Sequence, residues 1–168
     1  MLAKLIFPVG VPGSGKSTWA KTMFGGKYAI VSSDTVRKQK WGSLREAHDV
    51  TPEVKEERNE YVWNQFYKKL DQLLSNKVDC YADATNLTSR ARNRLRATAE
   101  KHGAELHVIL FDNVVEALQR NVERDHDAIV PDVVQEKFVR GFADSYQEVL
   151  RGQEQGWYNS VTIIGSLR

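Results

Sequence analysis

The chain of 168 residues is long enough to bury the core of one globular domain and too short for a second domain of similar size. Hydrophobic residues make up 41% of the chain and charged residues 27%, which is the ordinary range of globular proteins. The 24 basic and 22 acidic residues leave a net charge of only +2, which by itself does not indicate a nucleic-acid partner. The single cysteine excludes an intramolecular disulfide and a cysteine-based zinc site, and no apolar stretch approaches the roughly 20 residues that span a bilayer.

Five short apolar runs alternate along the chain with segments of helical periodicity. The apolar runs cover 2–9, 28–32, 78–83, 106–111 and 160–164. The helical segments cover 16–24, 52–74, 89–102, 114–123 and 131–150, and we expect a loop over 41–49. This alternation predicts an α/β fold: a five-stranded parallel sheet flanked by helices, one of which would form a lid, in a single domain over 1–168. Cys80 lies in the third apolar run, which predicts a buried, unreactive thiol.

A phosphate-binding loop (P-loop) follows the first apolar run. Residues 10–18, GVPGSGKST, fit the pattern G-x-x-x-x-G-K-[ST] and open the first helical segment. Glycines keep side chains away so that backbone N–H groups can surround phosphates at a helix N-terminus. The pattern predicts a bound ATP or GTP with Mg²⁺. The expected donor-binding residues are Gly13, Ser14, Gly15, Lys16, Ser17 and Thr18.

Asp34 and Arg37 follow the second apolar run. Because ligands bind beyond the carboxyl ends of parallel strands, Asp34 is expected beside the P-loop, where it could accept the proton of an attacking hydroxyl. Arg37, one helical turn later, could hold an anionic group of the acceptor. Asp34 could equally be the N-cap of a short helix over 35–40.

Three further groups of polar residues have both a functional and a structural interpretation. Asp83 closes the third apolar run, where it would coordinate magnesium, orient an arginine, or form an Asx turn. The arginines at 90, 92, 94 and 96 suit a phosphate backbone or a solvated helix face. Arg120 and Arg124 suit a lid that compensates charge on the transferred phosphoryl group, or an ordinary surface.

The motifs together resemble the 5′-hydroxyl polynucleotide kinase family, most closely the kinase domains of phage and bacterial nucleic-acid repair enzymes. The resemblance rests on VPGSGKSTWA at 11–20, SD at 33–34 with Arg37, DATNL at 83–87, RN at 120–121 with Arg124, and IVP at 129–131. It covers residues 5 to about 146. The family acid that Asp83 matches lies one residue later in some members, at the position of Ala84.

The resemblance implies transfer of the γ-phosphate of ATP to the 5′-hydroxyl end of DNA or RNA. The implied catalytic residues are Asp34 as general base, Lys16, and Arg124, with Arg120 and Arg124 on the donor nucleotide. The implied substrate-binding residues are Arg37, Asp83, Asn86, Arg90 and Arg94. Ser17 would bind magnesium, with Asp34 and Asp83 as further candidate ligands.

The acceptor expected from the resemblance is a single-stranded or end-exposed DNA or RNA. The chain has neither the D-x-D-G-T motif of a phosphatase domain nor a ligase segment, so a separate ligase or phosphatase would be its partner. We expect a cytoplasmic protein (in the host cytoplasm if a phage encodes it) with no membrane partner. A small-molecule kinase acting on a nucleoside monophosphate or a sugar acid is the alternative, and a nucleotide-binding switch module is a third.

Overall fold

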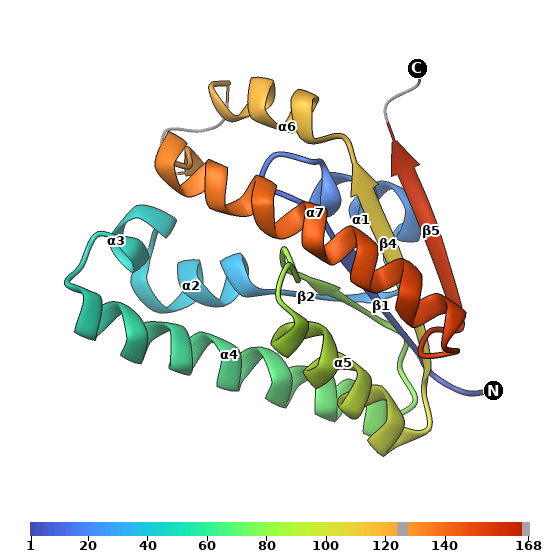
Figure 1. The fold of residues 1–168 in the computed structure, drawn as a ribbon. Coiled ribbons are helices and arrows are strands. Elements are labelled where there is room, and N and C mark those ends of the chain that lie inside the picture. Colours follow the sequence, from blue (N-terminus) through green and yellow to red (C-terminus); the bar gives the residue numbers. More distant parts are fainter. Residues whose placement is uncertain (124–127, 166–168) are drawn as a thin grey trace.

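The computed structural model describes residues 1–123 and 128–165 (Figure 1). Its strands are β1 (Lys4–Val9), β2 (Ala29–Ser32), β3 (Cys80–Asp83), β4 (Glu105–Asp112) and β5 (Ser160–Gly165). Its helices are α1 (Lys16–Phe24), α2 (Ser33–Trp41), α3 (Leu44–His48), α4 (Pro52–Ser75), α5 (Ser89–His102), α6 (Val114–Asn121) and α7 (Asp132–Glu154). None of the described helices is both long enough and apolar enough to cross a membrane.

The strands of the described chain form one parallel sheet in the order β2-β3-β1-β4-β5. The predicted α/β fold with a five-stranded parallel sheet is therefore confirmed. After β1 the chain forms β2 and β3 on one side of it, with β3 between β1 and β2, and then forms β4 and β5 on the other side. Ligands of open α/β sheets bind beyond the carboxyl ends of the strands at such a reversal of strand order. The P-loop, which follows β1, lies at this position.

Helices cover both faces of the sheet, as Figure 1 shows. On one face, Leu5, Phe7 and Val9 of β1 belong to a core shared with α4, α5 and α7. On the other face, Ile6 packs in a smaller cluster with Ala20 of α1. Burial on both faces explains why β1 is a continuous apolar run rather than an alternating one.

The burial and the raised pKa of Cys80 agree with the prediction of a buried, unreactive thiol. Cys80 is fully buried in β3. Burial, with a smaller contribution from the negative charge of Asp79, raises the pKa of the thiol to about 12. Since the thiolate is the reactive form, Cys80 is part of the core and not a nucleophile.

The prediction of a loop over 41–49 is wrong. Helix α2 extends to Trp41, and the segment then forms the short helix α3. The hydroxyl of Ser43 accepts a hydrogen bond of 3.0 Å from the backbone N–H of Glu46, which caps the N-terminus of α3. Helices α2, α3 and α4 therefore form a helical unit beside the carboxyl end of β2 (Figure 1).

Candidate active site

The P-loop has a backbone that only glycine adopts readily at two positions. Gly13 and Gly15 have φ angles of +84° and +88°. A Cβ atom on Gly13 would lie 2.6 Å from the carbonyl oxygen of Ala117, far inside van der Waals contact. The glycines of the motif therefore set both the turn of the loop and its close approach to α6.

Lys16 spans the P-loop from the first turn of α1. Its side-chain Nζ donates hydrogen bonds to the carbonyl oxygen of Val11 (2.7 Å) and to the hydroxyl of Ser14 (3.2 Å). Lys16 and Ser14 are both buried. The ammonium group is thus held inside the loop that the motif assigns to phosphates.

Ser17 and Asp83 join the P-loop to the end of β3. The hydroxyl of Ser17 donates a hydrogen bond of 2.7 Å to Oδ2 of Asp83. Burial raises the pKa of Asp83 above its usual value, although the bond from Ser17 and the charge of Lys16 oppose that rise. A hydroxyl and a carboxylate fit magnesium, which takes oxygen ligands from one or two protein groups and from phosphates. When bound here, Mg²⁺ would neutralise charge on the donor phosphates.

Asp34 lies just beyond the carboxyl end of β2, next to the candidate magnesium ligands. Ser32 of β2 pairs with Asp83 of β3 in the parallel register, so the residues after Ser32 emerge beside Asp83. The N-cap of α2 is Ser32, whose hydroxyl accepts from the N–H of Thr35 at 3.3 Å. The interpretation of Asp34 as an N-cap is therefore wrong, and its half-exposed carboxylate is available to an acceptor.

Arg37 is held in a fixed orientation beside Asp34. Its guanidinium lies 3.3 Å from Oδ1 of Asp34 and donates to Oδ1 of Asn59 at 3.3 Å. It also lies 5.9 Å from the ring centroid of Trp63. Burial lowers the pKa of Arg37, and the charge of Asp34 opposes this shift. Asn59 and Trp63 on α4 were not predicted as site residues, because no sequence spacing links them to α2.

Arg120 and Asn113 contact the P-loop from the opposite side. Arg120 on α6 donates to the carbonyl oxygen of Gly13 at 3.1 Å. Asn113, which precedes α6, donates to the carbonyl oxygen of Ser14 at 3.0 Å. The position of Arg120 is compatible with its predicted role on the donor nucleotide. Arg124, the predicted lid arginine, lies outside the described residues.

Asn86 and Thr18, two further predicted site residues, differ in their surroundings. Asn86 is buried, and its side-chain amide donates to the carbonyl oxygens of Pro8, Ala82 and Ala84 at 2.8–3.3 Å. These bonds fix the loop after β3, so the amide supports the site from within the protein. Thr18 is exposed in the first turn of α1, next to Ser17.

The arginines of α5 do not form one surface. Arg92 is buried and donates to the carbonyl oxygen of Asn86 (3.0 Å) and to the hydroxyl of Ser145 (2.9 Å), and it also pairs with Glu148. Arg90 is exposed near the start of α5, and Arg94 packs over an aromatic ring of α4. Arg92 thus joins α5 to α7, whereas Arg90 and Arg94 are accessible to a ligand.

Comparisons with known families and structures identify the family and the fold of the chain. Residues 5–149 match a family model described as an AAA domain, AAA_33. The chain belongs to this family. The match extends from β1 almost to the end of α7 and so includes the P-loop and the described site residues. A search among curated protein sequences finds no match.

Several solved structures share the fold. A chain of the Pnkp1/Rnl/Hen1 RNA repair complex aligns with a TM-score of 0.72 and 25% identity, over 88% of this chain and 46% of that one. Kti12 of Chaetomium thermophilum, in complex with ADP-AlF3, aligns with a TM-score of 0.68 and 18% identity, over 97% and 89% of the two chains. A gluconokinase of Sinorhizobium meliloti aligns with a TM-score of 0.61 and 16% identity, over 99% and 85%.

These structural relatives establish a P-loop kinase-like domain. The chain spans about half the length of the RNA repair chain that it matches. The identities to Kti12 and to the gluconokinase are low enough that these two show the fold alone. The fold thus hosts several acceptor chemistries, and the acceptor must be argued from this chain's own residues.

Proposed function

We propose that the protein is a polynucleotide 5′-hydroxyl kinase, which transfers the γ-phosphate of ATP to the 5′-hydroxyl end of DNA or RNA. The observation that carries the proposal is the ion pair of Asp34 and Arg37 beside the Ser17–Asp83 pair. It combines a candidate base, a cation for an anionic acceptor and a magnesium site at one edge of the sheet. The 25% identity to a chain of an RNA repair complex adds support.

In the proposed reaction the donor phosphates occupy the P-loop. Lys16 and Arg120, whose side chains both donate to carbonyl oxygens of the loop, provide positive charge for the phosphate oxygens. Ser17 and Asp83 would hold the magnesium ion, which would neutralise charge on the donor phosphates. Arg124, which the resemblance assigns to the lid, would add a further cation to the transferred group.

The acceptor end binds between the P-loop and α2. The carboxylate of Asp34 accepts the proton of the 5′-hydroxyl as its oxygen attacks the γ-phosphorus and the bond to the leaving ADP breaks. Arg37 binds the phosphate that follows the first nucleoside of the strand. Because Asn59 and Trp63 already orient Arg37, this contact costs little ordering on binding.

The test is a comparison of acceptors under identical conditions. The donor is ATP, or GTP in parallel, with a labelled γ-phosphate. The acceptors are a 5′-hydroxyl oligodeoxynucleotide, a 5′-hydroxyl oligoribonucleotide, AMP, a nucleoside, gluconate and adenosine 5′-phosphosulfate. We expect label on an oligonucleotide, and Lys16→Ala should reduce that label to background. Labelling of one of the small molecules, with both oligonucleotides unlabelled, would overturn the proposal in favour of a metabolite kinase.

A further inference from the structure

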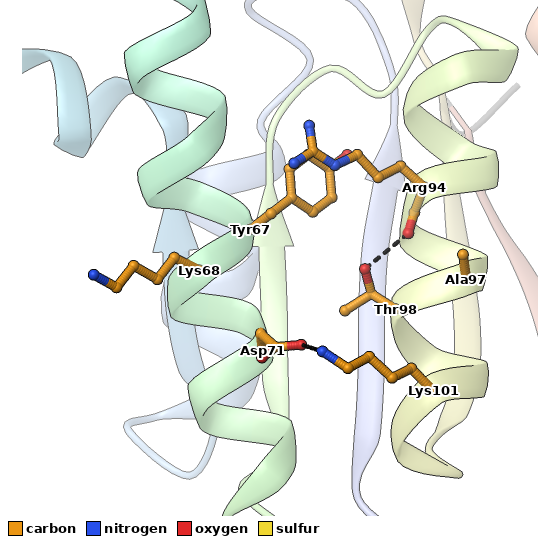
Figure 2. Close-up of a pocket in the computed structure, with 7 residues that line it drawn as sticks. All are labelled: Tyr67, Lys68, Asp71, Arg94, Ala97, Thr98 and Lys101. Carbon is orange, nitrogen blue, oxygen red and sulfur yellow. Dashed lines mark hydrogen bonds and ion pairs between the residues drawn. The ribbon is translucent and has the colours of Figure 1, made fainter.

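A hollow of about 360 Å³ lies between helices α4 and α5, outside the site described so far (Figure 2). Its lining comes from both helices and consists of Tyr67, Lys68, Asp71, Arg94, Ala97, Thr98 and Lys101. None of these residues has a part in the phosphate transfer argued above except Arg94, which the sequence assigned to the acceptor. The hollow is open to solvent and therefore accessible to an extended ligand.

Side-chain contacts between the helices fix the walls of this hollow. The guanidinium of Arg94 lies over the ring of Tyr67 (Figure 2), at 3.7 Å from the ring centroid. The hydroxyl of Tyr67 donates to the carbonyl oxygen of Ala91 at 3.3 Å. At the other end, Nζ of Lys101 lies 2.6 Å from Oδ1 of Asp71. Contacts between side chains of α4 and α5 thus define the shape of the hollow.

Positive charge predominates in the lining. Lys68, Arg94 and Lys101 are exposed cations, with Lys68 at the outer edge, where Figure 2 shows its ammonium directed outward. The one carboxylate, Asp71, is paired with Lys101 and with His102, which lower its pKa. The outer surface of the first turns of α4 is predominantly acidic instead, although it also exposes Lys55. Its exposed carboxylates are Glu53, Glu56, Glu57 and Glu60. A polyanionic strand that extends out of the active site should therefore bind along the hollow beside α5 rather than along the first turns of α4.

Aromatic contacts connect the hollow to the acceptor site. Trp63, which lies under Arg37, is one helical turn before Tyr67 on α4, and their ring centroids are 6.4 Å apart. Tyr67 in turn lies under Arg94. Two arginine–aromatic pairs, Arg37–Trp63 and Arg94–Tyr67, therefore follow one another from the candidate base to the hollow. Surfaces that combine cations with aromatic rings are typical of single-stranded nucleic-acid binding.

We propose that the α4–α5 hollow binds the sugar–phosphate backbone of the acceptor strand, a few nucleotides 3′ of the reacting 5′-hydroxyl. This inference rests on the proposed polynucleotide kinase function and adds a second contact region to it. Arg94 and Lys101 hold phosphates, and the exposed guanidinium of Arg94, supported by the buried ring of Tyr67, offers a surface on which a base can stack. The lining contains no exposed aliphatic side chain larger than alanine, which makes an apolar protein segment a poor occupant.

The test is the affinity of the protein for a 5′-hydroxyl single strand of about 12 nucleotides, a length within the range that one binding surface contacts. The strand is titrated at several salt concentrations without ATP. The double variant Arg94→Gln/Lys101→Gln removes two cations from the hollow. The double variant Lys69→Gln/Arg151→Gln is the matched control, since Lys69 and Arg151 are exposed and lie outside it.

We expect Arg94→Gln/Lys101→Gln to weaken binding of the strand roughly tenfold and to reduce the slope of log K against log salt by about 1.4, because each contact to a single-strand phosphate contributes about 0.7. The control should match the unaltered protein. Phosphorylation of a nucleoside 3′-monophosphate, which is too short to reach the hollow, should keep its kcat/KM in the control and in the single variant Lys101→Gln. On the unaltered protein, the strand should protect Lys101 but not Lys69 from acetylation.

The outcomes separate the two proposals. If the protein phosphorylates oligonucleotides while Arg94→Gln/Lys101→Gln binds them with unchanged affinity and salt slope, the hollow is not a subsite and the proposed function stands. If it phosphorylates only small molecules and binds no strand, both proposals fail. Loss of kcat/KM for the nucleoside 3′-monophosphate in Lys101→Gln would show a general structural defect and would also overturn the subsite.

Discussion

Asp34 has an exposed carboxylate, a cationic neighbour and no part in capping α2, so its replacement tests the chemistry of the site directly. We expect Asp34→Asn to lower kcat about 10²–10⁴-fold, because an amide cannot accept the proton of the acceptor hydroxyl. The affinity for ATP should be unchanged, since Asp34 belongs to the acceptor side. Turnover and nucleotide affinity are measured on the same variant.

Ser32→Ala is the matched control for Asp34→Asn. It removes the hydroxyl that caps α2 and should cost about 1 kcal/mol of unfolding free energy while turnover is retained. Near-normal turnover of Asp34→Asn would exclude Asp34 as the general base.

We expect Arg37 to distinguish a polynucleotide from other acceptors. An acceptor nucleoside with a 3′-phosphate should be preferred over the bare nucleoside, and Arg37→Ala should abolish that preference by removing a charge-assisted contact worth about 1.5–3 kcal/mol. The measured quantity is the ratio of kcat/KM for the two acceptors. This ratio is insensitive to a general loss of active protein, which matters because Arg37 is buried against Asn59 and Trp63. An unchanged ratio would assign Arg37 a purely structural role.

If Asp83 is a magnesium ligand as proposed, its protonation links metal binding to the stability of the protein. Its pKa is raised by burial, so the folded protein binds the proton more tightly than the unfolded chain does, and the metal-free protein loses stability as pH rises through the folded pKa. We expect metal-free Asp83→Asn to be at least as stable as the unaltered protein at pH 7. The difference should disappear below the ordinary pKa of aspartate, about 3.9.

The same Asp83→Asn variant should lose magnesium-dependent transfer, because a neutral amide is a weaker ligand than a carboxylate. Urea unfolding at several pH values and turnover at several magnesium concentrations are the measurements. A variant that is less stable at pH 7 without metal would contradict the assigned direction of the pKa shift.

Helix α5 depends on Arg92 for its attachment to α7. Arg92→Met should lower the unfolding free energy by about 2–4 kcal/mol, because the carbonyl of Asn86 and the hydroxyl of Ser145 lose a charged donor inside the protein. Glu148 is half-exposed, so solvent compensates its lost partner. Arg90→Met, at an exposed position of the same helix, should change stability by less than about 0.5 kcal/mol. Equal stability of the two variants in urea unfolding would contradict the role given to Arg92.

The helices and strands were predictable to within a few residues wherever periodicity was long, but tertiary partners were not. Periodicity shows which residues of α5 share a face, yet only the fold reveals that Arg92 meets Glu148, 56 positions later in the chain. Helix α3 was missed because it has only five residues. The spacing of Ser43 and Glu46, a capping-box signature, was the signal that could have found it.

The whole molecule explains why so much of the candidate site could be predicted. The P-loop, Asp34 and Asp83 each follow a strand, and a parallel sheet brings the carboxyl ends of β1, β2 and β3 to one edge. Strand termini can be recognised in a sequence. Asn59, Trp63 and Asn113 had no such signal, because their roles depend on how α4 and α6 pack against the loops.

Convergence of separate elements on one ligand also predicts how the nucleotide changes the stability of the whole domain. A donor nucleotide that contacts the P-loop, β3 and α6 only in the folded protein stabilises that state by mass action, by about 2.7 kcal/mol at a free concentration 100 times its Kd. For a domain of this size we expect Tm to rise about 5–10 °C with saturating ATP and magnesium.

Removal of magnesium by a chelator should reduce the rise, because Ser17 and Asp83 then lose their shared ligand. Lys16→Ala should reduce it as well, although the variant without nucleotide should fold normally. The measurement is thermal unfolding with and without each ligand. An equal rise in Lys16→Ala and in the unaltered protein would mean that the nucleotide binds away from the P-loop.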